Sequence, residues 1–219
     1  MIRCRPHKIF WVISFLLLFL PCYAGKSETW KLVKNKDGIK VYTRSISNSD
    51  LNELKAEILV HSSLNAIMAL LRDIPNFKDW VYHCKESHEL KKTGNEVYYY
   101  QYTSVPFPIS DRDLIIHSSW SQDEHTKVIY INGEGHPNFI PAKKGVVRIQ
   151  KFKSRWNLVP KGKGEVLIEY EISVDPAGWV PSWLVNLSAV EGPYETCKNL
   201  RNILKSAKYT NAQHVVKEF

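Results

Sequence analysis

The chain has 219 residues, of which 44% are hydrophobic and 24% are charged. This size and apolar content suit one domain with a substantial core, and no second domain is needed. The 30 Lys and Arg residues exceed the 22 Asp and Glu residues by +8, but they are spread along the chain rather than gathered in a block. The charge therefore argues against a nucleic-acid-binding protein and favours anionic membrane surfaces only mildly.

The first 24 residues have the pattern of a secretory signal peptide. Three basic residues precede an apolar stretch from Ile9 to Leu20, which contains one polar residue, Ser14, and Cys22-Tyr-Ala24 is a small-x-small cleavage site. The stretch is shorter than the roughly 20 residues that span a bilayer, so a retained anchor is the less favoured alternative. We expect cleavage after Ala24 and export to the periplasm or the extracellular space. The mature domain, residues 25–219, would carry 27 Lys and Arg against 22 Asp and Glu, or +5.

The mature chain is predicted to form three strands, two helices, six strands and a final helix. Segments Gly38–Arg44 and Leu54–Val60 alternate apolar and polar side chains, which is typical of strands with one solvent-facing side. Ser62 or Ser63 then caps a helix with an apolar stripe, and Asp73-Ile-Pro75 ends it, because a residue before proline is pushed out of the helical region. A second short helix with Phe77, Trp80 and Val81 follows.

From Glu86 onward the pattern predicts a meander of strands. Its turn signals are Gly94-Asn95, Gln122-Asp123, Gly133 to Pro137 and Lys161 to Gly164. The last strand has the clearest alternation of side chains, because one face is apolar and the other carries Glu169, Glu171 and Ser173. The apolar face, which we expect to look inward, consists of Val166, Ile168, Tyr170, Ile172 and Val174.

One long amphipathic helix is predicted to begin near Ser182 and to cover this sheet. Gly192-Pro193 interrupts it, and a proline inside a helix removes a backbone hydrogen bond, so we expect a kink there. Its apolar stripe, at three- and four-residue spacing, consists of Trp183, Leu184, Leu187, Val190, Tyr194, Cys197, Leu200 and Leu204. The stripe could serve as core alone or also as the wall of a cavity.

Three segments together resemble the START family of lipid-transfer domains. They are Val105-Pro-Phe-Pro-Ile-Ser-Asp-Arg-Asp113, Gly145-Val-Val-Arg148 and Asp175-Pro-Ala-Gly-Trp-Val-Pro181. The resemblance covers nearly the whole chain after residue 25. It implies an α+β helix-grip fold, in which a curved antiparallel sheet wraps around the long C-terminal helix, with two short helices after the third strand.

The resemblance also implies a cavity for one hydrophobic ligand, a lipid or a sterol-sized molecule, between the sheet and this helix. Arg112 could contact the ligand or satisfy a turn, and Arg148 could anchor the ligand or form a surface ion pair, since an unpaired buried charge is costly. The predicted ligand-binding residues are Tyr99, Gln101, Arg112, Arg148, Ile168, Tyr170, Ile172, Trp183, Leu187, Val190 and Tyr194.

Catalytic and metal-binding patterns are not evident in the sequence. The histidines include no His-x-x-x-His pair, and neither a glycine-rich phosphate loop nor a Gly-x-Ser-x-Gly elbow is present. We therefore predict a binding protein, not an enzyme, with no cofactor and no metal. The alternatives are a polyketide-cyclase or aromatase-type enzyme of the same superfamily and a partner-binding domain with a filled core. Cys84 and Cys197 could form a disulfide or remain free thiols.

Two loops are predicted to gate the cavity together with the final helix. They run from Val105 to Ser110 and from Gly133 to Lys144, and Phe107, Phe139 and Ile140 give them apolar tips. Such tips suit transient contact with a membrane surface, and the protein is expected to act as a monomer. Long loops of this kind are often functional.

Overall fold

The computed structural model describes residues 29–45, 52–178, 180, 182–212 and 215–219. One sheet follows the order β1-β2-β3-β10-β9-β7-β6-β5-β4, and β8 pairs with β6 outside this path. Its strands are β1 (Lys31–Lys36), β2 (Ile39–Ser45), β3 (Asn52–His61), β4 (Cys84–Thr93), β5 (Glu96–Thr103), β6 (Arg112–Gln122), β7 (Ile129–Gly135), β8 (Val147–Arg148), β9 (Lys151–Gly162) and β10 (Glu165–Asp175).

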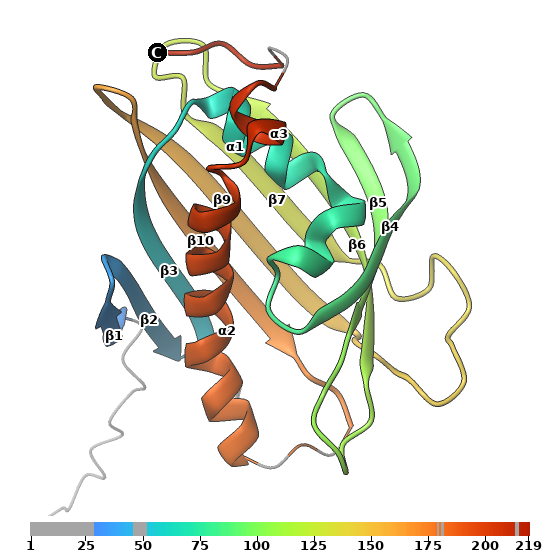
Figure 1. The fold of residues 1–219 in the computed structure, drawn as a ribbon. Helices are drawn as coiled ribbons and strands as arrows, with labels where there is room; N and C mark the ends of the chain where they lie inside the picture. Colours follow the sequence, from blue (N-terminus) through green and yellow to red (C-terminus); the bar gives the residue numbers. More distant parts are fainter. Residues whose placement is uncertain (1–28, 46–51, 179, 181, 213–214) are drawn as a thin grey trace, which may run out of the picture.

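The sheet curves around α2 (Ser182–Ile203), which lies along its concave side (Figure 1). The helices α1 (Leu64–Arg72) and α3 (Ala207–Thr210) and the 3-10 helix η1 (Ile74–Asp79) lie on the same side, nearer one end of the sheet. All long strands pair antiparallel, and β3, from the first part of the chain, pairs with β10 from the last. This is the predicted α+β helix-grip arrangement.

The start of α1 and the entry to η1 follow the predicted local signals. The Ser63 side chain caps α1 by accepting a hydrogen bond from the Ala66 N–H, at 3.1 Å. The C-terminal tail adds a second cap, because the Glu218 carboxylate accepts from the N–H groups of Leu64 and Asn65. A helix begins with unpaired N–H groups and a positive dipole end, so both caps stabilise α1. The second short helix is the 3-10 helix η1.

The turn predicted for Gly133 to Pro137 begins later than expected, because β7 continues through Gly133 to Gly135 and the turn joins His136 to Phe139. A Cβ at Gly133 would lie 2.5 Å from the Ser154 Oγ on β9, so glycine permits close strand packing here rather than a turn. The predicted strand start at Gly145 is a separate two-residue strand, β8, which runs parallel to β6, and β9 begins only at Lys151. The short helix α3 was not predicted from the sequence.

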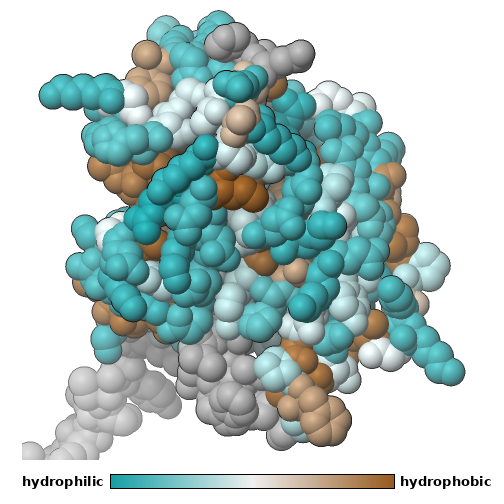
Figure 2. Space-filling model, viewed as in Figure 1, coloured by the Kyte–Doolittle hydropathy of each residue, from teal (hydrophilic) through white to brown (hydrophobic). Residues whose placement is uncertain are grey.

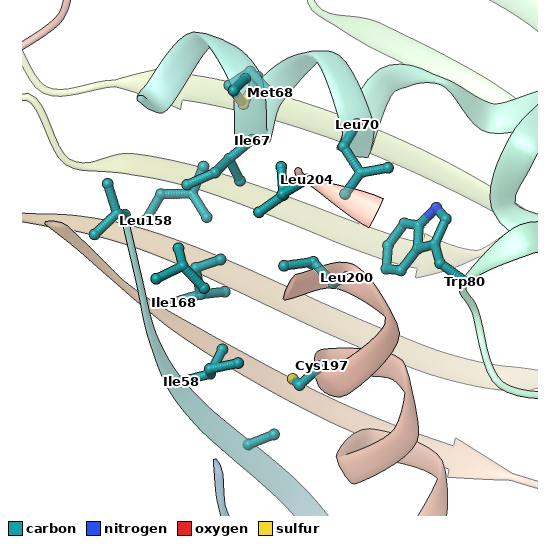
Figure 3. Close-up of a cluster of buried hydrophobic side chains, with 14 of the residues drawn as sticks. Ile58, Ile67, Met68, Leu70, Trp80, Leu158, Ile168, Cys197, Leu200 and Leu204 are labelled. Carbon is teal, nitrogen blue, oxygen red and sulfur yellow. The ribbon is translucent and has the colours of Figure 1, made fainter. Parts of the chain in front are cut away.

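The hydrophobic core fills the end of the sheet–helix space that lies under α1. Cys197 and Leu200 of α2 point toward Ile58 of β3 and Ile168 of β10, and Ile67 of α1 closes the other side (Figure 3). All five side chains are at most 1% exposed. Cys84 and Cys197 are both buried free thiols, and burial raises the pKa of Cys197 to about 12.

Side chains and backbone of the β1–β2 hairpin contact α2. Lys34 pairs with Glu191 at 2.8 Å and lies over the Tyr194 ring, 3.8 Å from its centroid. The Tyr194 hydroxyl donates to the Asp37 carboxylate at 2.5 Å, and Arg201 donates to the Asp37 carbonyl at 2.7 Å. These contacts lie on both sides of Pro193, through which α2 continues as one helix.

Candidate ligand-binding cavity

A cavity of about 400 Å³ occupies the rest of the space between the sheet and α2. Alternate residues of β5 and β6 form one wall, as the period-2 geometry of strands requires. The α2 wall is made of small or medium side chains, namely Val185, Ala189, Gly192, Pro193 and Thr196. The wall residues of β5 and β6 are Val97, Tyr99, Gln101, Thr103, Arg112, Leu114, Ile116, Ser118 and Trp120.

Five aromatic side chains form a continuous cluster in the middle of this cavity. Ring centroids are 5.6 Å apart for Tyr99 and Phe77, 5.3 Å for Phe77 and Trp80, and 6.2 Å for Trp80 and Trp156. Tyr170 stacks on Trp156 at 3.9 Å. These rings come from β5, η1, the residue after η1, β9 and β10, and all five line the cavity. Large apolar rings of this kind bind apolar ligand groups well.

The hydroxyls of Tyr99 and Tyr170 are free to bind a ligand. Burial raises the pKa of both phenols, with a smaller contribution from the neighbouring phenol at Tyr170, so both stay neutral at physiological pH. Among the described residues, neither hydroxyl has a hydrogen-bond partner. Each can therefore donate a hydrogen bond to a polar group inside an otherwise apolar space.

Arg112 lies at the end of the cavity formed by the loop after β5 and the segment before α2. It is 5% exposed, and its guanidinium donates to the carbonyls of Pro176 at 3.3 Å and Ala177 at 3.2 Å, and to the carbonyl of Ser110. Burial lowers its pKa, since a charged group loses hydration there. Arg112 thus joins the two segments that flank this end of the cavity.

Arg148 lies on the other side of the sheet and does not line the cavity. It pairs with both oxygens of Asp113, at 2.6 and 2.9 Å, and donates to the carbonyls of Pro137, Ile140 and Pro141. The hydrogen bonds to Asp113 raise the pKa of Arg148. Because Arg148 is 7% exposed and Asp113 1%, this is a buried ion pair rather than the surface pair considered from the sequence.

The structure brings five of the predicted ligand-binding residues to the cavity, and these are Tyr99, Gln101, Arg112, Tyr170 and Ile172. Ile168 shares their face of β10 but lies in the core, 0% exposed. Tyr194 packs against the β1–β2 hairpin, and Val190 is half-buried outside the lining. The side chains of Trp183 and Leu187 lie outside the described residues.

The difference on α2 has a geometric reason. Its residues at the cavity are Val185, Ala189, Gly192, Pro193 and Thr196, which recur at helical spacing but lie beside the predicted apolar stripe. The stripe itself packs in the core through Cys197 and Leu200. On this helix the side chains at the cavity are smaller or more polar than those of the stripe, so the hydrophobic pattern located the core face instead.

Sequence reasoning also missed the aromatic residues Phe77, Trp80 and Trp156. Phe77 and Trp80 were expected in a short helix with no ligand-binding role, and no inward face was predicted for the strand that contains Trp156. The alternation of Phe152, Ser154 and Trp156 on β9, all of which line the cavity, was the available signal.

The two ends of the cavity differ in character. At the Arg112 end the lining includes Val105, Pro176 and Val180, whereas the opposite end, beside the β4–β5 turn and α1, includes charged and polar side chains. These are Arg72, Glu89, Lys92, Asn95 and Glu96. On the face that carries the helices, hydrophobic surface is recessed between hydrophilic side chains (Figure 2).

Within the described residues, no group of three or more His, Cys, Asp or Glu side chains is arranged to hold a metal ion. None of the helices in these parts of the chain is long and apolar enough to span a membrane.

Comparisons with known proteins agree with this geometry. A crystal structure of a STAR-related lipid transfer protein from Xanthomonas axonopodis has a TM-score of 0.76 at 36% identity, covering 81% of this chain and 99% of that one. An uncharacterized Pseudomonas aeruginosa protein is 33% identical over 80% of this chain and 87% of its own length. Bovine phosphatidylcholine transfer protein is 28% identical over 87% of this chain and 90% of its own. The START domain model matches residues 19–210, and the chain therefore belongs to the START domain family.

Proposed function

We propose that this protein is an exported lipid carrier, which encloses one lipid in the cavity and transfers it between membranes as a monomer. The single observation that carries the proposal is the cavity of about 400 Å³ between the sheet and α2, with its five-ring aromatic cluster. A lipid left in water loses about 25 cal/mol for each Å² of exposed apolar surface, and such a cavity removes that surface from water. The names of the bovine and Xanthomonas relatives, both lipid transfer proteins, support the same function.

The cavity chemistry favours binding over catalysis. The carboxylates of its described lining are Glu89 and Glu96, and both lie at the exposed end beside the β4–β5 turn. A cyclase-type enzyme would need acid or base groups posed around the enclosed substrate. The enclosed part offers hydroxyl, amide and guanidinium groups, which suit recognition of a lipid head group.

Membrane contact is proposed at the Arg112 end of the cavity. Phe107, in the loop beside the cavity-lining residue Val105, is 96% exposed. Exposed aromatic side chains favour the membrane interface. Opening at this end would let a lipid pass between the bilayer and the cavity without crossing water.

Export is proposed from the amino-terminal pattern alone, because residues 1–28 lie outside the described part of the chain. If residues 1–24 are a signal peptide, the protein recovered from its host begins at Gly25 and is found in the periplasm or the medium. Amino-terminal sequencing of that protein tests this point, and an intact Met1 on a membrane-bound protein would contradict it.

Two neighbouring serines of β6 provide a matched test of lipid binding in the cavity. Ser118 lines the cavity, whereas Ser119 lies on the outer face of the sheet in a shallow polar depression. Ser118→Trp should fill the cavity, and Ser119→Trp should add the same bulk outside it. Both variants are compared with the unaltered protein by native mass spectrometry and by transfer of a fluorescent lipid between vesicles.

The unaltered protein and Ser119→Trp should each carry one lipid per chain and transfer it. Ser118→Trp, shown to be folded by circular dichroism, should lose both properties. Equal lipid loading in the two variants would place the lipid elsewhere, and an unaltered protein that never carries lipid would favour the partner-binding alternative.

A further inference from the structure

We propose that Arg112 is an anion-recognition site, and that the ligand of the cavity is an amphiphile with a phosphate or carboxylate group rather than an uncharged lipid. This inference rests on the proposed function and names the class of lipid that the cavity accepts. It depends on a comparison of how the two buried arginines of this chain are satisfied.

Arg112 uses only part of its hydrogen-bonding capacity. A guanidinium has five N–H donors. The structure pairs three of them, with the carbonyls of Ser110, Pro176 and Ala177. Arg148, by contrast, makes five hydrogen bonds, two of them to the Asp113 carboxylate. Arg112 therefore keeps donors for a ligand, and Arg148 does not.

No ion pair joins Arg112 to a carboxylate within the described residues. The neighbouring Asp111 raises the pKa of Arg112 through its charge, but burial lowers that pKa more strongly. The Asp111 oxygens themselves accept from the Val105 N–H at 2.8 Å and from the Tyr102 hydroxyl. Carbonyl oxygens supply partial charges only. A 95% buried cation with no carboxylate in hydrogen-bond contact is costly, and an anionic ligand group would lower that cost.

The position of Arg112 suits a head group rather than a hydrocarbon chain. Thr103 lies directly opposite Arg112 on β5, and Gln101 is the next cavity residue along that strand. These three polar side chains form one end of the wall. Beyond them the lining becomes apolar and aromatic, with Leu114, Ile116 and the five-ring cluster. An amphiphile bound with its anion at Arg112 would place its apolar part against these residues.

The shared chemistry is an oxyanion, which a guanidinium binds through paired N–H donors. It could be the phosphate of a phospholipid or the carboxylate of a fatty acid. Sterols, diacylglycerols and fatty alcohols carry no such group. The cavity should therefore distinguish lipids that have the same hydrocarbon part and differ only in charge.

Two matched pairs of ligands test this distinction on the delipidated protein. Dioleoyl phosphatidic acid is compared with dioleoylglycerol, and oleate is compared with oleyl alcohol, each pair in direct competition with native mass spectrometry as the readout. The unaltered protein should prefer the charged member of at least one pair about 10-fold or more, since hydrogen bonds to charged groups are worth about 1.5–3 kcal/mol. Which pair shows the preference identifies phosphate or carboxylate as the natural group.

Three variants assign the preference to Arg112. Arg112→Gln keeps a hydrogen-bond donor without the charge and should lose the preference, whereas Arg112→Lys should keep part of it. Lys143→Gln is the matched control, because Lys143 is an exposed cation near the same end, over the Tyr102 ring. Its preference should equal that of the unaltered protein. The ratio within a pair is independent of modest losses in folding stability.

Failure of this inference is distinguishable from failure of the proposed function. If the unaltered protein binds charged and uncharged members equally, or if Arg112→Gln keeps the preference, the protein is a lipid binder but Arg112 is structural. If no lipid of either pair binds, the lipid-carrier function itself fails. Displacement of bound lipid by inorganic phosphate alone would indicate a small-anion site and would overturn the lipid assignment.

Discussion

Arg112 and Asp113 are consecutive residues of β6 whose side chains leave opposite faces of the sheet. On the outer face, Asp113 and Arg148 neutralise each other and tie down the 137–141 loop. On the inner face, Arg112 lines the cavity with carbonyl partners but no carboxylate. Burial is nearly the same on both faces. The difference in partners indicates that one charge serves the fold, while the other is left for a ligand.

The largest loss of stability is expected from substitutions on the outer face of the sheet. Arg148→Met would leave the Asp113 carboxylate buried without a partner, and Asp113→Asn would do the same to the Arg148 charge. Breaking a buried ion pair in this way costs about 3–5 kcal/mol. Urea unfolding should show this loss in the free energy of unfolding for either variant.

The preference for charged lipid should survive in the same Arg148→Met protein, because Arg148 does not line the cavity. The double variant Asp113→Leu with Arg148→Met is the control, since removal of both charges should recover a large part of the lost stability. A single variant as stable as the unaltered protein would mean that the ion pair contributes little and that the comparison of the two faces is wrong.

A smaller loss of stability is expected on the inner face. Arg112→Gln removes the hydrogen bonds to the backbone carbonyls of Ser110, Pro176 and Ala177. It leaves no carboxylate without a partner. We expect a loss of about 1–2 kcal/mol in the free energy of unfolding. Urea unfolding of delipidated protein measures it beside Arg148→Met, and a loss as large as that of Arg148→Met would show that Arg112 also serves mainly the fold.

The smallest expected effect is on the stability of the protein at low pH. Hydrogen bonds from the Tyr102 hydroxyl and the Val105 N–H lower the pKa of Asp111 below its ordinary value of 3.8. A carboxyl whose pKa is lowered by folding stabilises the protein above that ordinary value, and the contribution is lost as pH falls through the lowered pKa. Between pH 6 and pH 3 the unaltered protein should therefore lose slightly more stability than Asp111→Asn.

This difference should stay below about 1 kcal/mol, because the group is close to solvent. Tyr102→Phe removes the hydrogen bond that lowers the pKa of Asp111 most. This variant should therefore also lose less stability between pH 6 and pH 3 than the unaltered protein. An Asp111→Asn protein that is more sensitive to acid than the unaltered protein would show that Asp111 does not stabilise this loop through its ionised form.

Much of the fold was predictable because its signals are local. The Ser63 cap, the alternation on β10 and the three START-like segments each depend on residues close in sequence. Tyr170 faces the cavity, as that alternation predicted, and Glu169 instead accepts a hydrogen bond from Asn157.

The remaining features depend on contacts that periodicity does not encode. Arg148 finds Asp113 only because β8 pairs in parallel with β6, which places residues 35 positions apart next to each other. On α2 the hydrophobic stripe followed the larger apolar side chains, such as Tyr194 and Leu200, into the core. The cavity face of the helix carries Ala189, Gly192 and Thr196, whose side chains are too small or too polar for a hydrophobic pattern to identify.

The position of the ligand's anionic group in a crystal structure of the lipid-loaded protein tests the central claim most directly. We predict a phosphate or carboxylate oxygen within hydrogen-bond distance of the Arg112 guanidinium, with the apolar part of the lipid against Tyr99, Trp156 and Tyr170. An anionic group at the opposite end of the cavity, beside Arg72 and Lys92, or an uncharged lipid with nothing bound to Arg112, would contradict it.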